Sequence, residues 1–401
     1  MGAAGLSEAR LGRMHDVLAA HVERGALPGI VTLVSRRGET YVDAIGAMGV
    51  DGPPMRRDTI FRIASMTKPI AAAAALILVE ECVLRLDDPV DALLPELADR
   101  RVLVTLDGPL HDTVPTNRPI TLRDLLTFRM GFGLHFGSPD DYPILAAAVR
   151  RQVATMPPAP AAMPDPDEYL RGLGELPLMS QPGEKWLYNT GSDVLGVLIA
   201  RATGQPLEAF LRERLFEPLG MTDTAFHVPA EKVDRLATSY TANRQTGGID
   251  LYDPADGGQW TAPPPFPSAA GGLVSTADDY LAFGLMMLRQ GRHGNERILS
   301  RSAVELMTTD QLTAGQKAVS GFVPGYFDHL GWGFGVSVVT GRDALWATPG
   351  RFGWDGGLGT SWASDPAEDL VGVMLHQRAE FPAFSKVYPD FWNSVYQAVD
   401  D

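Results

Sequence analysis

Ser65 and Lys68, in the segment Ser65-Met66-Thr67-Lys68, place a hydroxyl and an amine one helical turn apart. Residues three positions apart in a helix share a face, so the amine can take the proton of the hydroxyl. The amine must first be neutral, which requires lowering its pKa by roughly three units from about 10.4, or about 4 kcal/mol. Burial and a second cation nearby can supply this shift. The predicted chemistry is nucleophilic attack by Ser65 with Lys68 as its base.

Lysine is scarce in this chain, because only five of the 34 basic residues are lysine and the rest are arginine. An arginine keeps its proton under all ordinary conditions, whereas a buried lysine can lose it. We therefore expect that position 68 is a lysine for chemistry rather than for charge.

Two further segments offer the other groups that this chemistry needs. Tyr188 lies in a loop just before a predicted helix that begins at Asp193, and its phenol can relay a proton. Gly356 and Gly357 allow the backbone to approach a substrate closely, so that their N–H groups and that of Ser65 can hold an oxyanion. Each segment taken alone has an ordinary interpretation, a packed tyrosine and a tight turn.

The element that must position Ser65 is a helix that starts at the motif and ends near Leu84. A β-prone run, Phe61–Ser65, leads into it, and Pro69 fits only within a first helical turn. The free N–H groups of that turn favour developing negative charge. Another helix is predicted after Ser7, a plausible N-cap, because apolar residues follow at helical spacing.

Strand patterns occur near both ends of the chain. Residues 30–34 and 40–42 form a predicted β-hairpin, and a helical apolar stripe covers 391–399. The late strand candidates are Leu330–Val339, Gly359–Ala363 and Leu370–Leu375. We therefore predict an α+β fold, with one antiparallel sheet from both chain ends covered by the terminal helices. The predicted domains are a discontinuous sheet domain, 1–63 and 266–401, and a mostly helical domain, 64–265, with the active site between them.

The middle of the chain is predicted to be helical or irregular. Thr121 and Asp124 have the spacing of a capping box, and helices are expected at 193–202 and 207–216. The proline-rich stretches 156–167 and 262–267 are expected to be surface loops. Loops near 132–170 and 250–270 are expected to shape the pockets for the two sides of a substrate.

The bulk composition excludes several classes of partner. A net charge of −15 argues against nucleic acid and anionic membranes. The longest apolar run, 69–79, is too short to span a bilayer, and no secretory signal is visible, so a cytoplasmic protein is expected. Cys82 is the only cysteine and has apolar neighbours, so we expect a buried, inert thiol. No metal or organic cofactor is implied, and the oligomeric state is open.

Together these segments resemble the serine β-lactamase-like superfamily of penicillin-recognising hydrolases, and within it family VIII carboxylesterases and class C β-lactamase-related proteins. Phe61–Ile70 resembles the nucleophile motif, Trp186–Gly196 the second motif, and Ala270–Asp279 a further typical segment. The resemblance implies a β-lactamase/transpeptidase-like fold, with Ser65 as nucleophile, Lys68 as its partner and Tyr188 as proton relay. Phe128 stands where the family usually has a histidine.

The third motif departs from that of penicillin-recognising enzymes, which reads Lys/His-Thr-Gly. The matching residues here are Trp354-Asp355-Gly356, or Arg351-Phe352-Gly353 in a register shifted by three residues. With Trp354 at this place the site lacks a positive anchor for a carboxylate, which favours neutral esters over penicillins. Asp355 adds to that preference if it points inward.

The expected function is hydrolysis of short- to medium-chain carboxylic esters through an acyl-enzyme. A β-lactamase, an amidase or D-aminopeptidase, an acyltransferase, and a binding protein of the same fold without catalysis remain open. A Ser-His-Asp hydrolase is disfavoured because no G-x-S-x-G elbow occurs, and His329 and His376 are expected to have local partners. His15 and His21 lack the spacing of a metal site.

Overall fold

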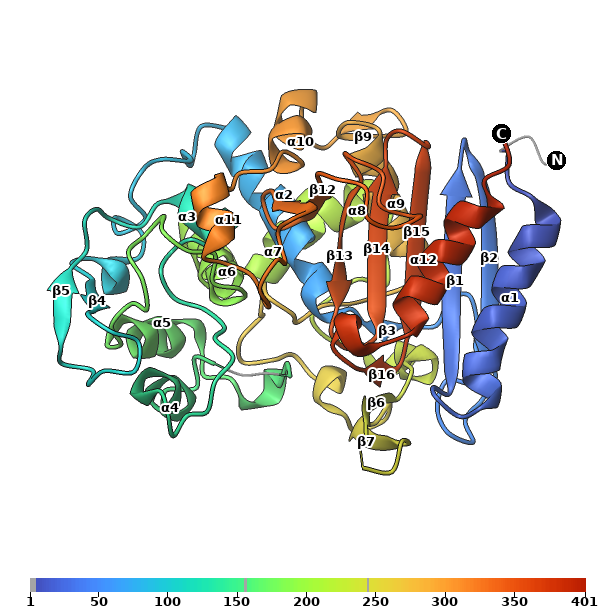
Figure 1. The fold of residues 1–401 in the computed structure, drawn as a ribbon, viewed down its shortest axis with the longest axis horizontal. Coiled ribbons are helices and arrows are strands. Elements are labelled where there is room, and N and C mark those ends of the chain that lie inside the picture. Colours follow the sequence, from blue (N-terminus) through green and yellow to red (C-terminus); the bar gives the residue numbers. More distant parts are fainter. Residues whose placement is uncertain (1–4, 155–156, 244) are drawn as a thin grey trace.

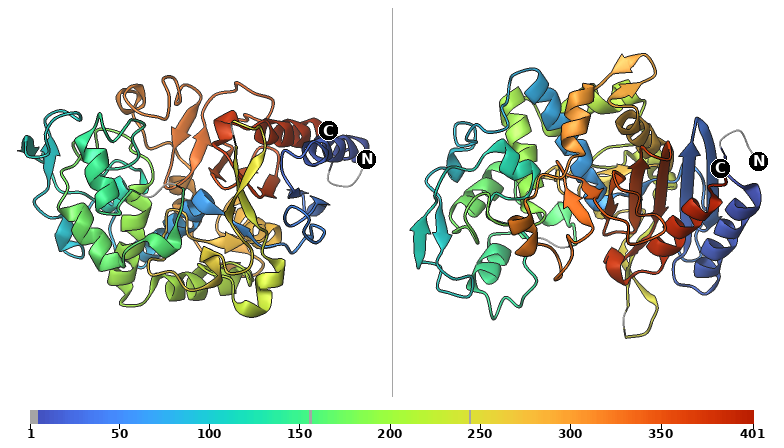
Figure 2. Two further views of the ribbon diagram at one scale, coloured as in Figure 1. Left: turned by 90° about the horizontal axis from the view of Figure 1, so that it is seen from below. Right: turned by 45° about the horizontal axis from the view of Figure 1, so that its top comes forward.

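The computed structural model describes residues 5–154, 157–243 and 245–401. A sheet with its covering helices forms one side of the molecule, and a mostly helical region forms the other side (Figure 1). The N- and C-terminal segments lie side by side at the outer edge of the sheet, at a distance from the helical region in both views of Figure 2.

The sheet has seven strands in the order β11-β12-β13-β14-β15-β1-β2. It confirms the predicted sheet from both chain ends, because β1 pairs antiparallel with β15, from Ile30 opposite His376 to Arg36 opposite Leu370. The predicted hairpin is also confirmed, since β1 pairs with β2 along its whole length. The strands are β1 Gly29–Arg36, β2 Glu39–Gly46, β11 Leu330–Trp332, β12 Ser337–Val339, β13 Phe352–Gly356, β14 Thr360–Asp365 and β15 Leu370–His376.

Helices cover both faces of this sheet. The predicted terminal helices, α1 Glu8–Glu23 and α12 Val387–Ala398, pack against each other on one face (Figure 1). Their apolar side chains form one buried cluster with residues of β1, β14 and β15. On the other face α9, Ala277–Leu288, contacts β1, β14 and β15. Burial on both sides explains why all the residues of β1 and β15 are buried.

Two late segments differ from the predicted pattern. The run 330–339 is not one strand but the hairpin β11–β12, because Gly335 turns the chain with φ of 69°. A side chain at Gly335 would lie 3.0 Å from the carbonyl oxygen of Lys68, so this turn packs against the start of the helix that follows Ser65. The segment Phe352–Gly356, in which no strand was predicted, is β13 and pairs with β14.

The helix after Ser65 is α2, Thr67–Glu80, and it ends four residues before the predicted Leu84. The apolar run stops at Glu80-Glu81, and Cys82 follows in a turn with φ of 59°. The prediction of a buried thiol is wrong, because Cys82 is exposed. Of its two apolar neighbours, Val83 is exposed and Leu84 is buried, so apolar residues in this turn are not buried together.

The middle of the chain contains the predicted helices together with short strands. The segment predicted as a helix at 207–216 is α7 continued by a π-helical turn, Arg212–Phe216. The loops predicted near 132–170 and 250–270 hold α4, α5 and part of β7, and Met156 lies outside the described residues. The helices are α3 Leu122–Leu126, α4 Pro143–Arg150, α5 Pro166–Gly174, α6 Thr190–Thr203, α7 Leu207–Leu211, α8 Glu217–Leu219, α10 Arg301–Met307 and α11 Ala314–Ala318. The remaining strands are β3 Phe61–Arg62, β4 Arg101–Leu103, β5 Thr113–Pro115, β6 Ser239–Ala242, β7 Ile249–Asp253, β8 Val274–Ser275, β9 Arg292–His293, β10 Glu296–Arg297 and β16 Arg378–Ala379.

Within the described ranges no single helix has the length and apolarity to cross a membrane. One pair of helices is long and apolar enough only when its two members are taken together, and the pair is bent by 83° at the break. The two helices are Thr190–Thr203 and Leu207–Leu219.

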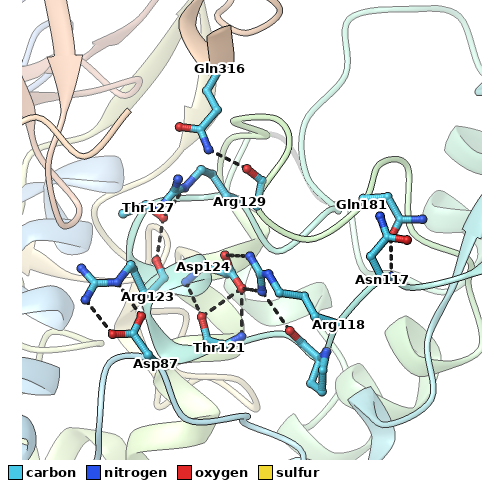
Figure 3. A network of polar contacts seen from close by, with 12 residues as sticks. Asp87, Asn117, Arg118, Thr121, Arg123, Asp124, Thr127, Arg129, Gln181 and Gln316 are labelled. Atoms are coloured by element: carbon cyan, nitrogen blue, oxygen red, sulfur yellow. Dashed lines mark hydrogen bonds and ion pairs between the residues drawn. The ribbon is translucent and has the colours of Figure 1, made fainter. Parts of the chain in front are cut away.

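A polar network fixes the start of α3 and the chain that follows it (Figure 3). The predicted capping box is confirmed, because Thr121 and Asp124 bond to each other's backbone N–H groups, and Asp124 also binds Arg118. Gln316 of α11 donates to the carbonyl of Gly183 at 2.7 Å. The first bonds fix the helix that precedes Phe128, and the last one ties α11 to the segment that leads to Tyr188.

Candidate active site

Ser65 lies in a short 3-10 turn, Ala64–Met66, between β3 and α2. The turn is held from both sides, because β3 pairs with β8 and Thr360 of β14 donates to the carbonyl of Ile63 at 3.1 Å. Ala64 has φ of 44°, a left-handed conformation that costs a non-glycine residue roughly 1–2 kcal/mol. The chain therefore turns sharply just before Ser65, at the junction between the sheet and the helical region.

Lys68 is fully buried beside Ser65, as the spacing predicted. Its Nζ atom donates to Ser65 Oγ at 3.0 Å and also to the carbonyl oxygen of Ala270. Burial lowers the pKa of Lys68 to about 7, and the negative charge of Asp193 acts in the opposite direction. Burial and a second cation were both expected to lower the pKa of Lys68. In the structure burial lowers it, but the charged group that acts on Lys68 is the anion Asp193, which raises it.

Tyr188 lies against the same pair of residues. The centre of its ring is 4.5 Å from Lys68 Nζ, and its hydroxyl accepts a hydrogen bond from Trp354 Nε1 at 2.7 Å. Burial raises the pKa of Tyr188, and hydrogen bonds with Ser65 and Trp354 act against that rise. Tyr188 thus keeps its proton at neutral pH, while Lys68 is poised to give its proton up.

An aromatic cluster surrounds the Tyr188 ring. The ring centres of Phe128, Trp186 and Phe322 are 5.4, 5.4 and 5.1 Å from that of Tyr188. Phe128, at the place of the usual family histidine, has φ of 56° and is buried. Phe322 and Trp332, whose ring centre is 6.4 Å from that of Tyr188, were not among the predicted site residues. The density of aromatic residues over 322–332 was the available signal for them.

Neighbouring residues of β13 point to opposite faces of the sheet, so the two possible registers of the third motif place their first residues in different surroundings. Trp354 faces Tyr188, whereas Asp355 accepts a hydrogen bond from Ser361, whose hydroxyl also binds Trp392 of α12. Arg351 lies 4.0 Å from the ring centre of Trp392, in the layer of α12. Trp354 therefore lies beside Tyr188, whereas Arg351 lies on the side of α12, and Asp355 does not point inward.

Gly356 and Gly357 have different surroundings although they are adjacent. A Cβ atom on Gly356 would lie 2.3 Å from the carbonyl oxygen of Ile63, so only glycine lets β13 approach the segment before Ser65. A Cβ atom on Gly357 would meet nothing within 4 Å. Gly357 lines the same cavity as Ser65.

That cavity has a volume of about 80 Å³ and contains Ser65 in its wall. Both predicted pocket loops contribute to it, through Pro157–Pro160 and Met163 from one and Ser268 and Ala270 from the other. A larger cavity of about 680 Å³ is lined mainly by the helical region, and Trp186 and Phe322 of the aromatic cluster form part of its wall.

Two polar residues of this wall were missed in the analysis of the sequence. Asn189 has φ of 87° and ψ of −66°, the conformation of a strained γ-turn, which places it in the cavity wall directly after Tyr188. Asp193 is buried and accepts hydrogen bonds from Ser268 Oγ at 2.7 Å and from the Ala270 N–H at 3.1 Å. The only signal for Asp193 was its place within the second motif.

The histidines lie outside this arrangement. His376 is buried in β15, where burial lowers its pKa to about 3, and its Nδ1 accepts from the backbone N–H of Arg378. His15 and His21 pair with Asp43 and Asp390 at 2.7 Å each. His329 is exposed. In the part of the chain that the structure describes, no group of His, Cys, Asp or Glu side chains has the arrangement of a metal site.

The chain is similar to known proteins over most of its length. The model of the beta-lactamase family matches residues 14–395. Protein Rv1367c of Mycobacterium tuberculosis is 40% identical over 364 residues, covering 88% of this chain and 87% of that protein. Esterase EstB of Burkholderia gladioli is 34% identical over 388 residues, covering 92% and 90%. The solved structure of EstCE1, described as a hydrolase with promiscuous acyltransferase activity, superposes with a TM-score of 0.79 at 26% identity, covering 97% of this chain and 99% of that one.

Proposed function

The chain belongs to the beta-lactamase family, and on that premise we propose that it is a serine esterase that cleaves short- to medium-chain carboxylic esters through an acyl-enzyme. The observation that carries the proposal is the contact of one buried amine with both Ser65 Oγ and the Tyr188 ring. The similarity to esterase EstB over most of both chains supports the same class of reaction.

The reaction starts at Ser65. Its Oγ attacks the ester carbonyl carbon as the hydroxyl proton passes to Lys68 Nζ, 3.0 Å away. Backbone N–H groups of Ser65 and of the Gly356–Gly357 segment hold the oxyanion of the tetrahedral intermediate. When the intermediate collapses, the alcohol leaves with a proton delivered through Tyr188 Oη, and the acyl group stays on Ser65. Water then attacks the acyl-enzyme, with Lys68 as base and Tyr188 as relay.

The division of labour between Lys68 and Tyr188 follows from their opposite pKa shifts. Burial lowers the pKa of Lys68 to about 7, so a large fraction of the amine is neutral at physiological pH. Burial raises the pKa of Tyr188, so the phenol stays protonated and is not the base that activates Ser65. It can give its proton to the leaving group only as a relay, while it receives another proton from Lys68. The proton of Ser65 can thus pass to Lys68 and then through Tyr188 to the leaving alcohol.

Trp354 supports a neutral ester as the substrate. Its indole N–H donates to the Tyr188 hydroxyl, in the place where the third motif of penicillin-recognising enzymes has a cation. Arg351 is turned toward α12 and cannot anchor a carboxylate at this site. A substrate with a free carboxylate, such as a penicillin, would have to bind without that anchor.

Acyl transfer is the second candidate, because EstCE1 is described as a hydrolase with promiscuous acyltransferase activity. Both reactions pass through the same acyl-enzyme and differ only in whether water or another alcohol attacks it. Partitioning of a p-nitrophenyl ester between hydrolysis and transfer to an added alcohol, measured from the products, separates them.

The test of the proposal compares p-nitrophenyl acetate, butyrate and octanoate with a chromogenic cephalosporin, for wild type and Ser65→Ala. We expect turnover of the shorter esters, little cleavage of the cephalosporin, and loss of ester turnover in Ser65→Ala. Full ester activity in Ser65→Ala would overturn the mechanism. Efficient cephalosporin turnover with negligible ester cleavage would overturn the substrate but keep Ser65.

Labelling by a fluorophosphonate separates an enzyme from a binding protein of the same fold. The reagent forms a covalent bond only with an activated serine, so wild type should be labelled at neutral pH and Ser65→Ala should not. No adduct on wild type at any pH would exclude Ser65 as an activated nucleophile.

A further inference from the structure

Asp193 is a buried carboxylate in the wall of the Ser65 cavity, and its hydrogen-bond partners lie on a different chain segment. It stands in the first turn of α6, and only 5% of the residue is exposed. Ser268 Oγ donates to its Oδ1 at 2.7 Å, and the N–H of Ala270 donates to the same oxygen at 3.1 Å. One carboxylate therefore fixes the 268–270 segment against α6.

The segment that Asp193 fixes also holds Lys68. The carbonyl oxygen of Ala270 accepts a hydrogen bond from Lys68 Nζ, while the N–H of Ala270 is bound to Asp193. The N–H of Gly271 donates to Ser268 Oγ at 3.1 Å, and the N–H of Leu273 donates to Thr67 Oγ1 at 3.2 Å. Residues 268–273 thus form a wall between Asp193 and the first turn of α2. A carbonyl accepts from a charged or a neutral amine alike, so this wall holds Lys68 in both protonation states.

The charge of Asp193 reaches Lys68 without a direct ion pair. It favours the charged amine and so opposes the effect of burial on the pKa of Lys68. The titratable groups that face this pair are Tyr188, whose ring lies 4.5 Å from Lys68 Nζ, and Tyr169 of α5, whose pKa is raised by burial and by Asp193. Both tyrosines are neutral near pH 7. Burial raises the pKa of Asp193, while the hydrogen bonds from Ser268 and Ala270 and the charge of Lys68 act against that rise and favour the carboxylate.

We propose that Asp193 is a positioning residue for the base of this site. It holds the Ala270 peptide against the Lys68 amine, and its negative charge keeps that amine more basic than burial alone would leave it. The inference rests on the proposed function, because it concerns the same serine and lysine. It adds a residue that acts through Lys68 and sets the pH at which Ser65 becomes reactive.

The test follows the rate of fluorophosphonate labelling of Ser65 from about pH 5 to about pH 9 in wild type and Asp193→Asn. The amide oxygen of Asn can still accept both hydrogen bonds, so this variant removes the charge and keeps the contacts. We expect the midpoint of the pH profile to move to lower pH by about half a unit or more, a severalfold change in proton affinity. A merely structural role would lower the rate equally at every pH and leave the midpoint unchanged.

Ser268→Ala is the matched variant, because it keeps the charge of Asp193 and removes one of its two hydrogen bonds. The carboxylate then gains a proton more readily, so we expect a smaller shift of the midpoint in the same direction. This variant also carries the test if Asp193→Asn does not fold.

An unchanged midpoint in the folded variants, with wild type labelled normally, would overturn the role of Asp193. Absence of labelling in wild type would instead overturn the proposed function. The two failures are distinguishable, because the role of Asp193 is judged only when wild type is labelled.

Discussion

At the scale of single residues, the proposed reaction depends on the amine of Lys68, which is buried beside the hydroxyl of Ser65. Lys68 makes hydrogen bonds to Ser65 and Ala270, and its stem is enclosed by the core, so it has one available position. The sequence could indicate this pair because three residues of one helical turn fix the spacing locally. It could not indicate Trp354 as the partner of Tyr188, since 166 residues separate them.

The first prediction concerns the pH dependence of the reaction. Lys68 acts as a base only when neutral, so kcat/KM for p-nitrophenyl acetate should rise as the pH rises through about 7, the pKa that burial gives this group. Lys68→Arg keeps a positive charge but cannot lose its proton, and should lower kcat by about 10²–10⁴-fold. A flat wild-type profile between about pH 5 and about pH 8 would contradict Lys68 as the base.

The second prediction concerns the indole N–H of Trp354, which donates to the Tyr188 hydroxyl at 2.7 Å. Trp354→Phe keeps an aromatic ring there and removes the donor, at a cost of about 1 kcal/mol, or about fivefold in kcat. Trp332→Phe is the control, because its indole N–H has no hydrogen-bond partner among the described residues. Steady-state kinetics should show the larger loss for Trp354→Phe. Equal losses in the two variants would mean that ring packing matters and the hydrogen bond does not.

At the scale of elements, β13 lies against the segment that leads into Ser65. Gly353, Asp355, Gly356 and Gly357 have low β propensity, so the local pattern does not indicate a strand. The strand forms because β14 pairs with it over five residue positions, which is a tertiary effect. A similar limit explains why the prediction of a buried Cys82 is wrong, because apolar neighbours along the chain do not decide which way a turn residue faces.

The third prediction follows from the close approach of β13 to Ile63. Gly356→Ala would place a methyl group 2.3 Å from the Ile63 carbonyl oxygen and should lower the free energy of unfolding by about 1–3 kcal/mol. Gly357→Ala adds the same methyl group in open space and should leave stability nearly unchanged. Urea denaturation followed by tryptophan fluorescence measures both. Equal stability of the two variants would show that β13 can move away from Ile63 at no cost.

At the scale of the whole molecule, the site lies where two regions of the chain meet. The sheet supplies Trp354 and Gly356, α6 and its preceding loop supply Tyr188 and Asp193, and α2 supplies Lys68. This architecture could be predicted from the strand and helix patterns at the two chain ends together with the family resemblance. The aromatic contacts that enclose Tyr188 could not be predicted in the same way, because they join loops that are remote in sequence.

The fourth prediction concerns the face of the sheet that lies away from Ser65. Trp392 of α12 packs on Gly372 of β15, and its indole N–H donates to Ser361 at 3.0 Å. Trp392→Ala should therefore lower the free energy of unfolding by about 3–5 kcal/mol. Leu345→Ala is the control, because Leu345 is 67% exposed and its loss should change stability by no more than about 0.5 kcal/mol. Chemical denaturation compares the two. A Trp392→Ala variant as stable as the control would mean that α12 contributes little to the stability of the sheet.

The pairing of β1 with β15 also has a consequence for biosynthesis. Ile30 of β1 and His376 of β15 are neighbours in the sheet, so the ribosome makes β1 long before it makes its partner strand. At about 5–20 residues per second, the edge of β1 that pairs with β15 in the finished sheet stays unpaired for tens of seconds. The long insertion has time to collapse first around α2 and α6, through contacts closer in sequence. We therefore expect that the sheet is completed, and the chain protected from aggregation, only after the final strands and α12 have left the ribosome.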